Sequence, residues 1–147
     1  MNETIIAAKI VLANTYVLYF KAHSFHWNVV GESFPQYHDF LGDFYQEVYG
    51  AVDKLAEEIR ALGEFAPRSI EELYKFKTIS DQNQAMGSRE MFMDLQTANS
   101  ATLDSLNKLF SMLTAANEHG FANFIADRMD AHKKHAWMLT SILKPGN

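Results

Sequence analysis

Two histidines near the start of the chain have the spacing of a shared site. His26 and His38 are twelve residues apart in the stretch HSFHWNVVGESFPQYHDF, on either side of a turn marked by Gly31 and Pro35. Apolar periodicity predicts a helix that ends near His26 and another that begins near His38, so the turn makes these helices antiparallel and brings the imidazoles together. Imidazole binds iron and zinc, and the competing interpretation is a structural pair of packed histidines.

Asp53 and Glu57 are the carboxylates best placed to complete such a site. They are four residues apart and therefore share one face of the second predicted helix, although a solvated helix face is the competing interpretation. His38 and Asp53 are fifteen residues apart on that helix, which is about 22 Å along its axis. Because no single metal ion touches both, a complete site takes its histidines from one chain and its carboxylates from another, across a two-fold axis.

Four long stretches carry apolar residues in steps of three and four, which predicts helices. The predicted helices span residues 3–29, 34–62, 88–117 and 121–143. Gly63 is placed to end the second helix, and Ser88 is placed to cap the third. Ser69, followed three residues later by Glu72, predicts a short helix inside the long connection 64–87. The pattern predicts an all-α four-helix bundle whose middle connection crosses the bundle.

Composition excludes several classes of function. The chain of 147 residues has a formal net charge of −5, which does not favour nucleic acid as a partner. It contains no cysteine, so disulfides and thiolate ligands are excluded. Its apolar runs are short, and Glu3, Lys9 and Lys21 interrupt the N-terminal stretch, so we expect a soluble, cytoplasmic protein without a membrane span.

The sequence resembles the Dps family of mini-ferritins from about residue 5 to residue 143. The resemblance rests on HWNVVGESFPQYH, on DKLAEEIRALG and on the tail AHKKHAWMLTSIL. The motif residues are His26, Trp27, Asn28, Gly31, Phe34, His38, Asp53 and Glu57. It implies a single domain over residues 1–147 with a ferritin-like four-helix bundle, in which a long crossover between helices two and three carries a short helix.

The resemblance also implies a function. Dps proteins form hollow dodecamers that oxidise ferrous iron, commonly with hydrogen peroxide, at sites between subunits, and they store the ferric product and limit oxidative damage. Carried over to this chain, His26, His38, Asp53 and Glu57 become the iron ligands of a ferroxidase with one or two irons per site. Trp27, beside His26, becomes a candidate radical trap, with simple packing as the alternative.

Two departures from the family pattern leave alternatives open. The family usually has a carboxylate four residues after the second histidine, where this chain has Gly42, with Asp39 and Asp43 as candidate helpers nearby. A shell with an impaired site that binds zinc or no metal is therefore one alternative, and restoring a carboxylate at position 42 is expected to tighten ferrous binding.

The second alternative is a DNA-compacting nucleoid protein. The first eight residues contain no Lys or Arg, and the chain ends in KPGN, so we expect no tight binding of DNA. The run from His132 to His135 looks basic, but we expect it to serve the surface of the last helix. Asp127, and less directly Glu118 and Asp130, are candidates for an acidic pore through which iron enters.

Overall fold

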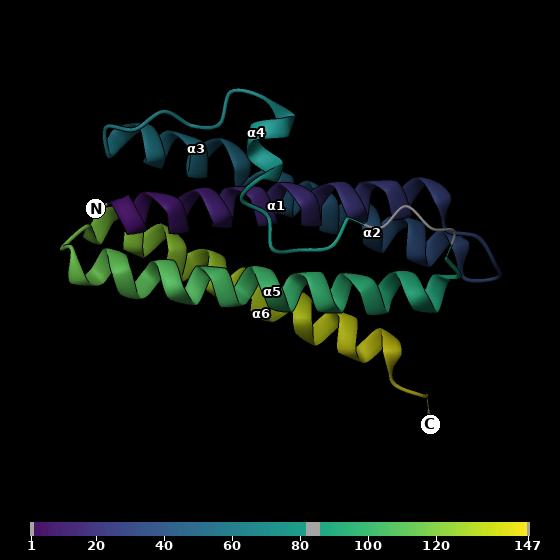
Figure 1. The fold of residues 1–147 in the computed structure, drawn as a ribbon. Helices are drawn as coiled ribbons and strands as arrows, with labels where there is room; N and C mark the ends of the chain where they lie inside the picture. The colour runs from purple at the N-terminus through teal and green to yellow at the C-terminus, as the bar shows by residue number, and fades with distance from the viewer. Residues whose placement is uncertain (1, 82–85, 147) are drawn as a thin grey trace.

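The computed structural model describes residues 2–81 and 86–146, and these residues form six helices without any strand. The helices are α1 (Asn2–Asn28), α2 (Phe34–Tyr49), α3 (Val52–Ala61), α4 (Ile70–Tyr74), α5 (Ser88–Ala115) and α6 (His119–Leu143). The long helices lie alongside one another, and α4 sits in the connection that crosses them (Figure 1). The prediction of a four-helix bundle with a crossover that carries a short helix is confirmed.

The second predicted helix is interrupted, so the prediction of one continuous helix over 34–62 is wrong. Gly50 and Ala51 keep right-handed helical dihedral angles, but Ala51 N–H donates to Val48, three residues back, rather than four. A glycine costs a helix up to about 1 kcal/mol relative to alanine, so Gly50 weakens the helix here. The three-residue hydrogen bond of Ala51 tightens the turn locally and bends the helix between α2 and α3. Because α3 continues in the general direction of α2, the start of α2 and the end of α3 remain far apart (Figure 1).

Helix α1 is the central element of the fold. It contacts α2, α3, α4 and α5, which explains why its side chains are apolar on several faces. Among the described residues α1 is also the one helix long and apolar enough to cross a membrane, but 61% of that stretch is buried inside the protein. It is therefore the core helix of a soluble fold.

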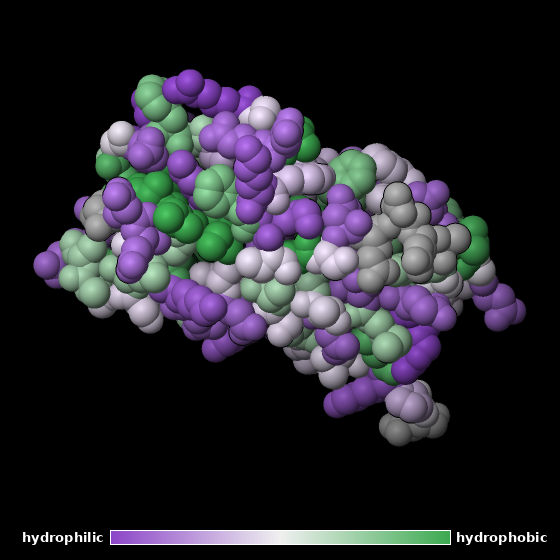
Figure 2. Space-filling model, viewed as in Figure 1, coloured by the Kyte–Doolittle hydropathy of each residue, from purple (hydrophilic) through white to green (hydrophobic). Residues whose placement is uncertain are grey.

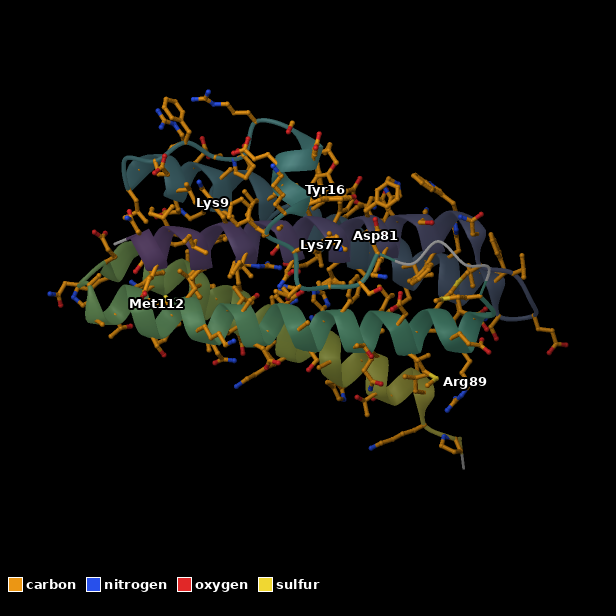
Figure 3. The ribbon with its side chains drawn as sticks, viewed as in Figure 1. Lys9, Tyr16, Lys77, Asp81, Arg89 and Met112 are labelled. Carbon is orange, nitrogen blue, oxygen red and sulfur yellow. The ribbon has the colours of Figure 1, made fainter. Side chains whose placement is uncertain are left out.

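The crossover is fastened to α1 by a buried asparagine. Asn14 Oδ1 accepts a hydrogen bond from Thr78 N at 2.8 Å, and Asn14 Nδ2 donates to Thr78 Oγ1 at 2.9 Å. The segment that carries Lys77 and Asp81 consequently lies across α1, and Tyr16 stands between α1 and α4 (Figure 3). Because the anchored segment links the far end of α3 to the start of α5, it fixes the ferritin-like order of the helices.

Of the three helix-end signals predicted from the sequence, two are confirmed and one is wrong. Ser69 Oγ accepts from Glu72 N at 3.0 Å, as the capping prediction requires. Gly63, with φ of +97°, ends α3 in the left-handed conformation that glycine favours. The expected cap at Ser88 is wrong, because Ser88 is already the first residue of α5 and Gly87 holds the cap position.

Two apolar clusters fill the bundle, one at each end. The first includes Val11, Leu55 and Ile125, and the second includes Leu18, Phe44 and Leu95. Polar side chains separate the clusters at the middle of the bundle. They are Asn14, Glu47, Asn99, Arg128 and His132. Apolar side chains also gather on the surface over the N-terminal half of α1, between α3 and α5 (Figure 2).

Replacing Asn14 with alanine tests the anchor of the crossover. The change removes two hydrogen bonds to Thr78 and leaves the backbone N–H of Thr78 without this partner. We therefore expect the free energy of unfolding to fall by an amount on the order of 1–3 kcal/mol. Urea unfolding at fixed protein concentration measures this loss. Asn107→Ala, which removes an exposed bond to Leu103, is the control and should shift the midpoint far less. Equal shifts in both variants would contradict a special role for Asn14.

Candidate functional site

The two histidines of the motif face each other across the turn between α1 and α2. Their rings stack at 3.8 Å between centroids with 16° between planes. Gly31, with φ of +119°, makes the turn possible, and Pro35 occupies the first turn of α2, where its missing N–H is no loss. The ring of Phe34 stacks on the other side of His38, at 4.9 Å. The structure therefore brings His26 and His38 together as predicted.

Reciprocal hydrogen bonds fix the tautomer of both rings. His26 Nδ1 lies 2.7 Å from the carbonyl oxygen of His38, and His38 Nδ1 lies 2.8 Å from the carbonyl oxygen of His26. A carbonyl only accepts, so each Nδ1 carries a proton and donates it. In the neutral imidazoles each Nε2 then keeps its lone pair, and within the described residues neither Nε2 takes part in a hydrogen bond. This is the arrangement of metal-binding histidines, whose other nitrogen is held by a backbone carbonyl.

Gly42 is buried directly against the ring of His26. A Cβ at this position would lie 3.1 Å from His26 Cε1 and 3.3 Å from His26 Nδ1, closer than ordinary contact. The sequence offered no reason for a glycine inside α2, and the close approach of the imidazole provides one. Any side chain at position 42 must displace the His26 ring by a few tenths of an ångström.

The carboxylates of the motif lie elsewhere on the chain. Asp53 and Glu57 are exposed on α3, beyond the bend that ends α2. Within residues 2–81 and 86–146 no group of three histidine, aspartate or glutamate side chains is close enough to hold a metal ion. One chain therefore presents two imidazole nitrogens in one place and two exposed carboxylates in another.

The remaining predicted residues are dispersed. Asp39 is exposed on α2, and Asp43 lines a cleft between α2 and α6. Asp127 is exposed near the start of α6. Trp27 is 57% exposed, and its ring lies 4.1 Å from that of His23. Asp39, Asp43 and Asp127 form no metal-binding cluster with other described residues.

A second polar cluster, at the middle of the bundle, was not predicted. Arg128 donates to both oxygens of Glu47, at 2.6 and 2.9 Å, and His135 Nε2 donates to Glu47 Oε1 at 2.7 Å. Arg128 also donates to His132 Nε2 at 3.2 Å, while His132 Nδ1 donates to Asn99 Oδ1 at 2.8 Å. These bonds join α2, α5 and α6 below a cleft of about 430 Å³.

The cluster shifts the titration of two of its members. Burial raises the pKa of Glu47, but hydrogen bonds from His135 and Arg128 and the charge of Arg128 outweigh burial and hold that pKa well below its usual range. Burial, reinforced by the charge of Arg128, lowers the pKa of His132 to about 3. Near neutral pH the cluster therefore contains an ionised carboxylate, a guanidinium and a neutral His132.

The prediction that His132 and His135 serve the helix surface is wrong. His132 is fully buried and His135 is 4% exposed. The available signal was the spacing of Arg128 and His132, which are four residues apart and so share one face of α6. What the sequence did not reveal was that this face points at Glu47, eighty-one residues before Arg128.

Comparison with known proteins shows that the chain is similar to ferritins over most of its length. The ferritin-like domain matches residues 9–146. Antigen TpF1 of Treponema pallidum is 31% identical over 138 residues, covering 90% of this chain and 76% of that protein. A DNA protection during starvation protein of Brevibacillus brevis is 28% identical over 134 residues, covering 90% and 89%.

A solved structure supports the fold independently. The Dps protein of Vibrio cholerae, described as a member of a broad superfamily of ferritin-like diiron-carboxylate proteins, superposes with a TM-score of 0.92 at 24% identity. The match covers 97% of this chain and 90% of that one. At this identity the likeness shows the fold alone.

Substitution of Gly42 separates two effects on metal binding. Gly42→Ala adds only the Cβ that presses on His26, and we expect it to weaken binding of cobalt(II), a spectroscopic probe, measured by titration. Gly42→Asp adds the same Cβ and a carboxylate, so the difference in cobalt(II) affinity between the two variants measures the effect of the carboxylate alone. If Gly42→Ala binds cobalt(II) as the parent does, the His26 ring tolerates the contact and Gly42 is not required for this site.

The central cluster predicts how stability depends on pH. The unfolded chain takes up protons below the ordinary pKa of histidine, 6.5, and of glutamate, 4.5, whereas folded His132 and Glu47 do not. The free energy of unfolding should therefore fall as the pH drops below 6.5 and fall more steeply below 4.5.

Glu47→Gln tests this explanation by unfolding measurements across that range. The variant should lose stability near neutral pH, because Arg128 keeps its charge without a carboxylate partner. Since Glu47 is 40% exposed, the loss should be smaller than the ~3–5 kcal/mol of a fully buried pair. It should also depend less on pH below 4.5, while Glu71→Gln, an exposed control, keeps the parental profile. A parental profile in Glu47→Gln would remove Glu47 as the cause.

Proposed function

The chain belongs to the ferritin-like family and, within it, to the Dps mini-ferritins, and from this membership we propose that it oxidises ferrous iron and stores the ferric product. A mini-ferritin role in iron storage and protection follows from the family. The ligands, the oxidant and the assembly go further than the family membership, and they are proposals.

The observation that carries the proposal is the pair of histidines with free Nε2 atoms. Backbone carbonyls hold both Nδ1 atoms, so the rings cannot turn away or change tautomer without losing these bonds. A preorganised pair of imidazole Nε2 atoms suits a divalent cation, but two ligands are too few for iron. We propose that Asp53 and Glu57 of a second copy supply the hard oxygen ligands.

The surface around the histidines supports a second copy as the source. Phe20, Trp27 and Tyr49 are large apolar side chains that are 43%, 57% and 52% exposed. They belong to one aromatic strip on α1 and α2, because Phe20 contacts Trp27, and Tyr49 connects through Tyr19 and His23 to the ring of Trp27. Burying such a strip favours association, and a two-fold pair would place two equivalent sites at the interface.

The proposed chemistry divides the work between the two halves of the site. His26 and His38 hold ferrous iron, and Asp53 and Glu57 neutralise its charge and favour the ferric state. With hydrogen peroxide as oxidant, two ferrous ions give up one electron each, and the peroxide takes two electrons and two protons to become two waters. Trp27, close to the histidines, is the proposed trap for any radical that escapes this two-electron route.

The proposed assembly is a hollow dodecamer of single-domain subunits that span residues 1–147, in the cytoplasm. Asp127 is exposed near the start of α6 and is the proposed lining of an acidic entry pore. Asp39 and Asp43 are the proposed helpers of the iron site. The alternative of a site that takes up zinc or no metal follows from Gly42, which leaves the usual carboxylate position without a ligand.

DNA compaction is the alternative of a different class. The net charge of −5 disfavours binding of the chain to a phosphate backbone. Compaction predicts retardation of plasmid DNA at physiological salt, which iron storage does not require.

Complementation between two variants tests the shared site. One variant lacks the histidines (His26→Ala with His38→Ala), and the other lacks the carboxylates (Asp53→Asn with Glu57→Gln). Each alone should assemble but oxidise ferrous iron poorly. When the two are unfolded, mixed and reassembled, about half of the two-fold pairs are mixed and each regains one of its two sites, so roughly a quarter of the parental rate should return.

The control replaces His119 and Asp104, which are exposed and outside the proposed site, and should keep the parental rate. Circular dichroism and shell size are measured for every sample, so that failed assembly is not counted as lost activity. No recovery in properly assembled mixed shells would overturn the shared site and return His26 and His38 to a structural role.

A further inference from the structure

A tyrosine and a histidine on α1 form a hydrogen-bonded pair beside the candidate site. Tyr19 Oη lies 3.0 Å from His23 Nδ1, one helical turn further along. The ring of His23 stacks on Tyr45 at 3.9 Å and 8°, and it lies 4.1 Å from the ring of Trp27. Within the described residues Tyr19 is the tyrosine whose hydroxyl lies within hydrogen-bond distance of a basic side chain, His23.

The pair connects to the metal-binding histidines through ring contacts. The ring of His26 lies 5.3 Å from Tyr45 and 6.2 Å from His23. Tyr19 in turn lies 6.1 Å from Tyr45 and 4.6 Å from Tyr49. Aromatic rings a few ångströms apart exchange electrons readily, so an electron can pass from Tyr19 through Tyr45 towards the imidazole of His26.

The hydrogen-bond distance between Tyr19 and His23 suits a coupled transfer of an electron and a proton. Burial and neighbouring tyrosines raise the pKa of Tyr19, so its phenol keeps its proton. With the His23 proton on Nε2, the Tyr19 hydroxyl donates to Nδ1, and a proton can move along this bond.

We propose that Tyr19 and His23 form a redox-active pair in which Tyr19 gives up an electron while its proton passes to His23 Nδ1. The electron leaves through Tyr45 to a one-electron oxidant formed from hydrogen peroxide at His26 and His38, and this part of the proposal rests on the proposed function. The pair gives the protein an activity distinct from two-electron iron oxidation. It reduces the one-electron oxidant that forms when peroxide reacts with a single ferrous ion and no second ferrous ion is present.

The step balances in atoms and electrons. One ferrous ion and hydrogen peroxide yield a ferric ion, hydroxide and a hydroxyl radical. The hydroxyl radical takes one electron from Tyr19 and becomes hydroxide. The O–H bond of Tyr19 breaks, leaving a phenoxyl radical, and a new N–H bond forms on His23, which becomes an imidazolium.

The choice of Tyr19 follows from its partner. A phenol loses an electron far more easily when a base takes its proton at the same time, because the strongly acidic phenol cation is avoided. Trp27 and Tyr45 touch the ring of His23, but neither is hydrogen-bonded to it in the described structure. The hole should therefore come to rest on Tyr19, including a hole that first forms on Trp27.

Metal-free protein tests the pair without the iron chemistry. A ruthenium tris(bipyridine) complex, illuminated with persulfate, supplies a one-electron oxidant, and samples frozen at once are examined by electron paramagnetic resonance. The parent should show a tyrosyl signal. Tyr19→Phe should lose most of it, and so should His23→Phe, which keeps a ring beside Tyr45 but removes the base.

Tyr74→Phe, a change in α4 outside the strip, is the matched control and should keep the parental signal. If His23→Phe fails to assemble, His23→Gln also removes the base, and the same loss is expected. A parental signal in Tyr19→Phe, or in an assembled His23 variant, overturns the pair.

A second arm uses ferrous iron with limiting peroxide in place of the photo-oxidant. The same tyrosyl signal, lost in Tyr19→Phe, supports delivery of the oxidant from the histidine site. A signal in the metal-free arm but none with iron overturns that delivery and keeps the pair, so failure of the iron site and failure of the pair give different results.

Discussion

The ion pair between Glu47 and Arg128 is the interaction on which the bundle depends. Arg128 is 8% exposed and permanently charged, so its place between two apolar clusters requires a partner of opposite charge. Helix α1 packs closely on α2 and α5, and α5 packs on α6, which leaves the side between α2 and α6 to be bridged largely by this pair and by His135. The fourth side of the bundle is thus closed by hydrogen bonds and charge.

This cluster also disfavours a metal site in the middle of the bundle. Glu47, His132 and His135 are residue types that bind metals, but the guanidinium of Arg128 lies against Glu47 and His132. A cation is therefore already present where a metal ion would bind. The metal binding proposed for this chain accordingly lies at the end of α1 and the start of α2, where His26 and His38 are partly exposed.

Glycine has two separate roles around the histidine pair. Gly31 lets the chain turn in a conformation that side chains disfavour, which sets α1 and α2 antiparallel. Gly42 gives the His26 ring room to lie against α2, and this close approach accompanies the mutual bonds between the histidines and the backbone. The second role has no local signature, because it depends on a ring sixteen residues earlier in the chain.

The sequence alone determined the four-helix architecture, the crossover with its short helix and the meeting of the two histidines, because helical periodicity, capping and a tight turn are local properties. It also determined that Asp53 is too far along the helix from His38 to share a metal within one chain. Tertiary structure decided the rest. The break at Gly50, the burial of His132 and His135 against Glu47, the contact of His26 with Gly42 and the stacking of His23 on Tyr45 all depend on which helix faces come together. That pairing follows from packing between distant segments, which local periodicity does not encode.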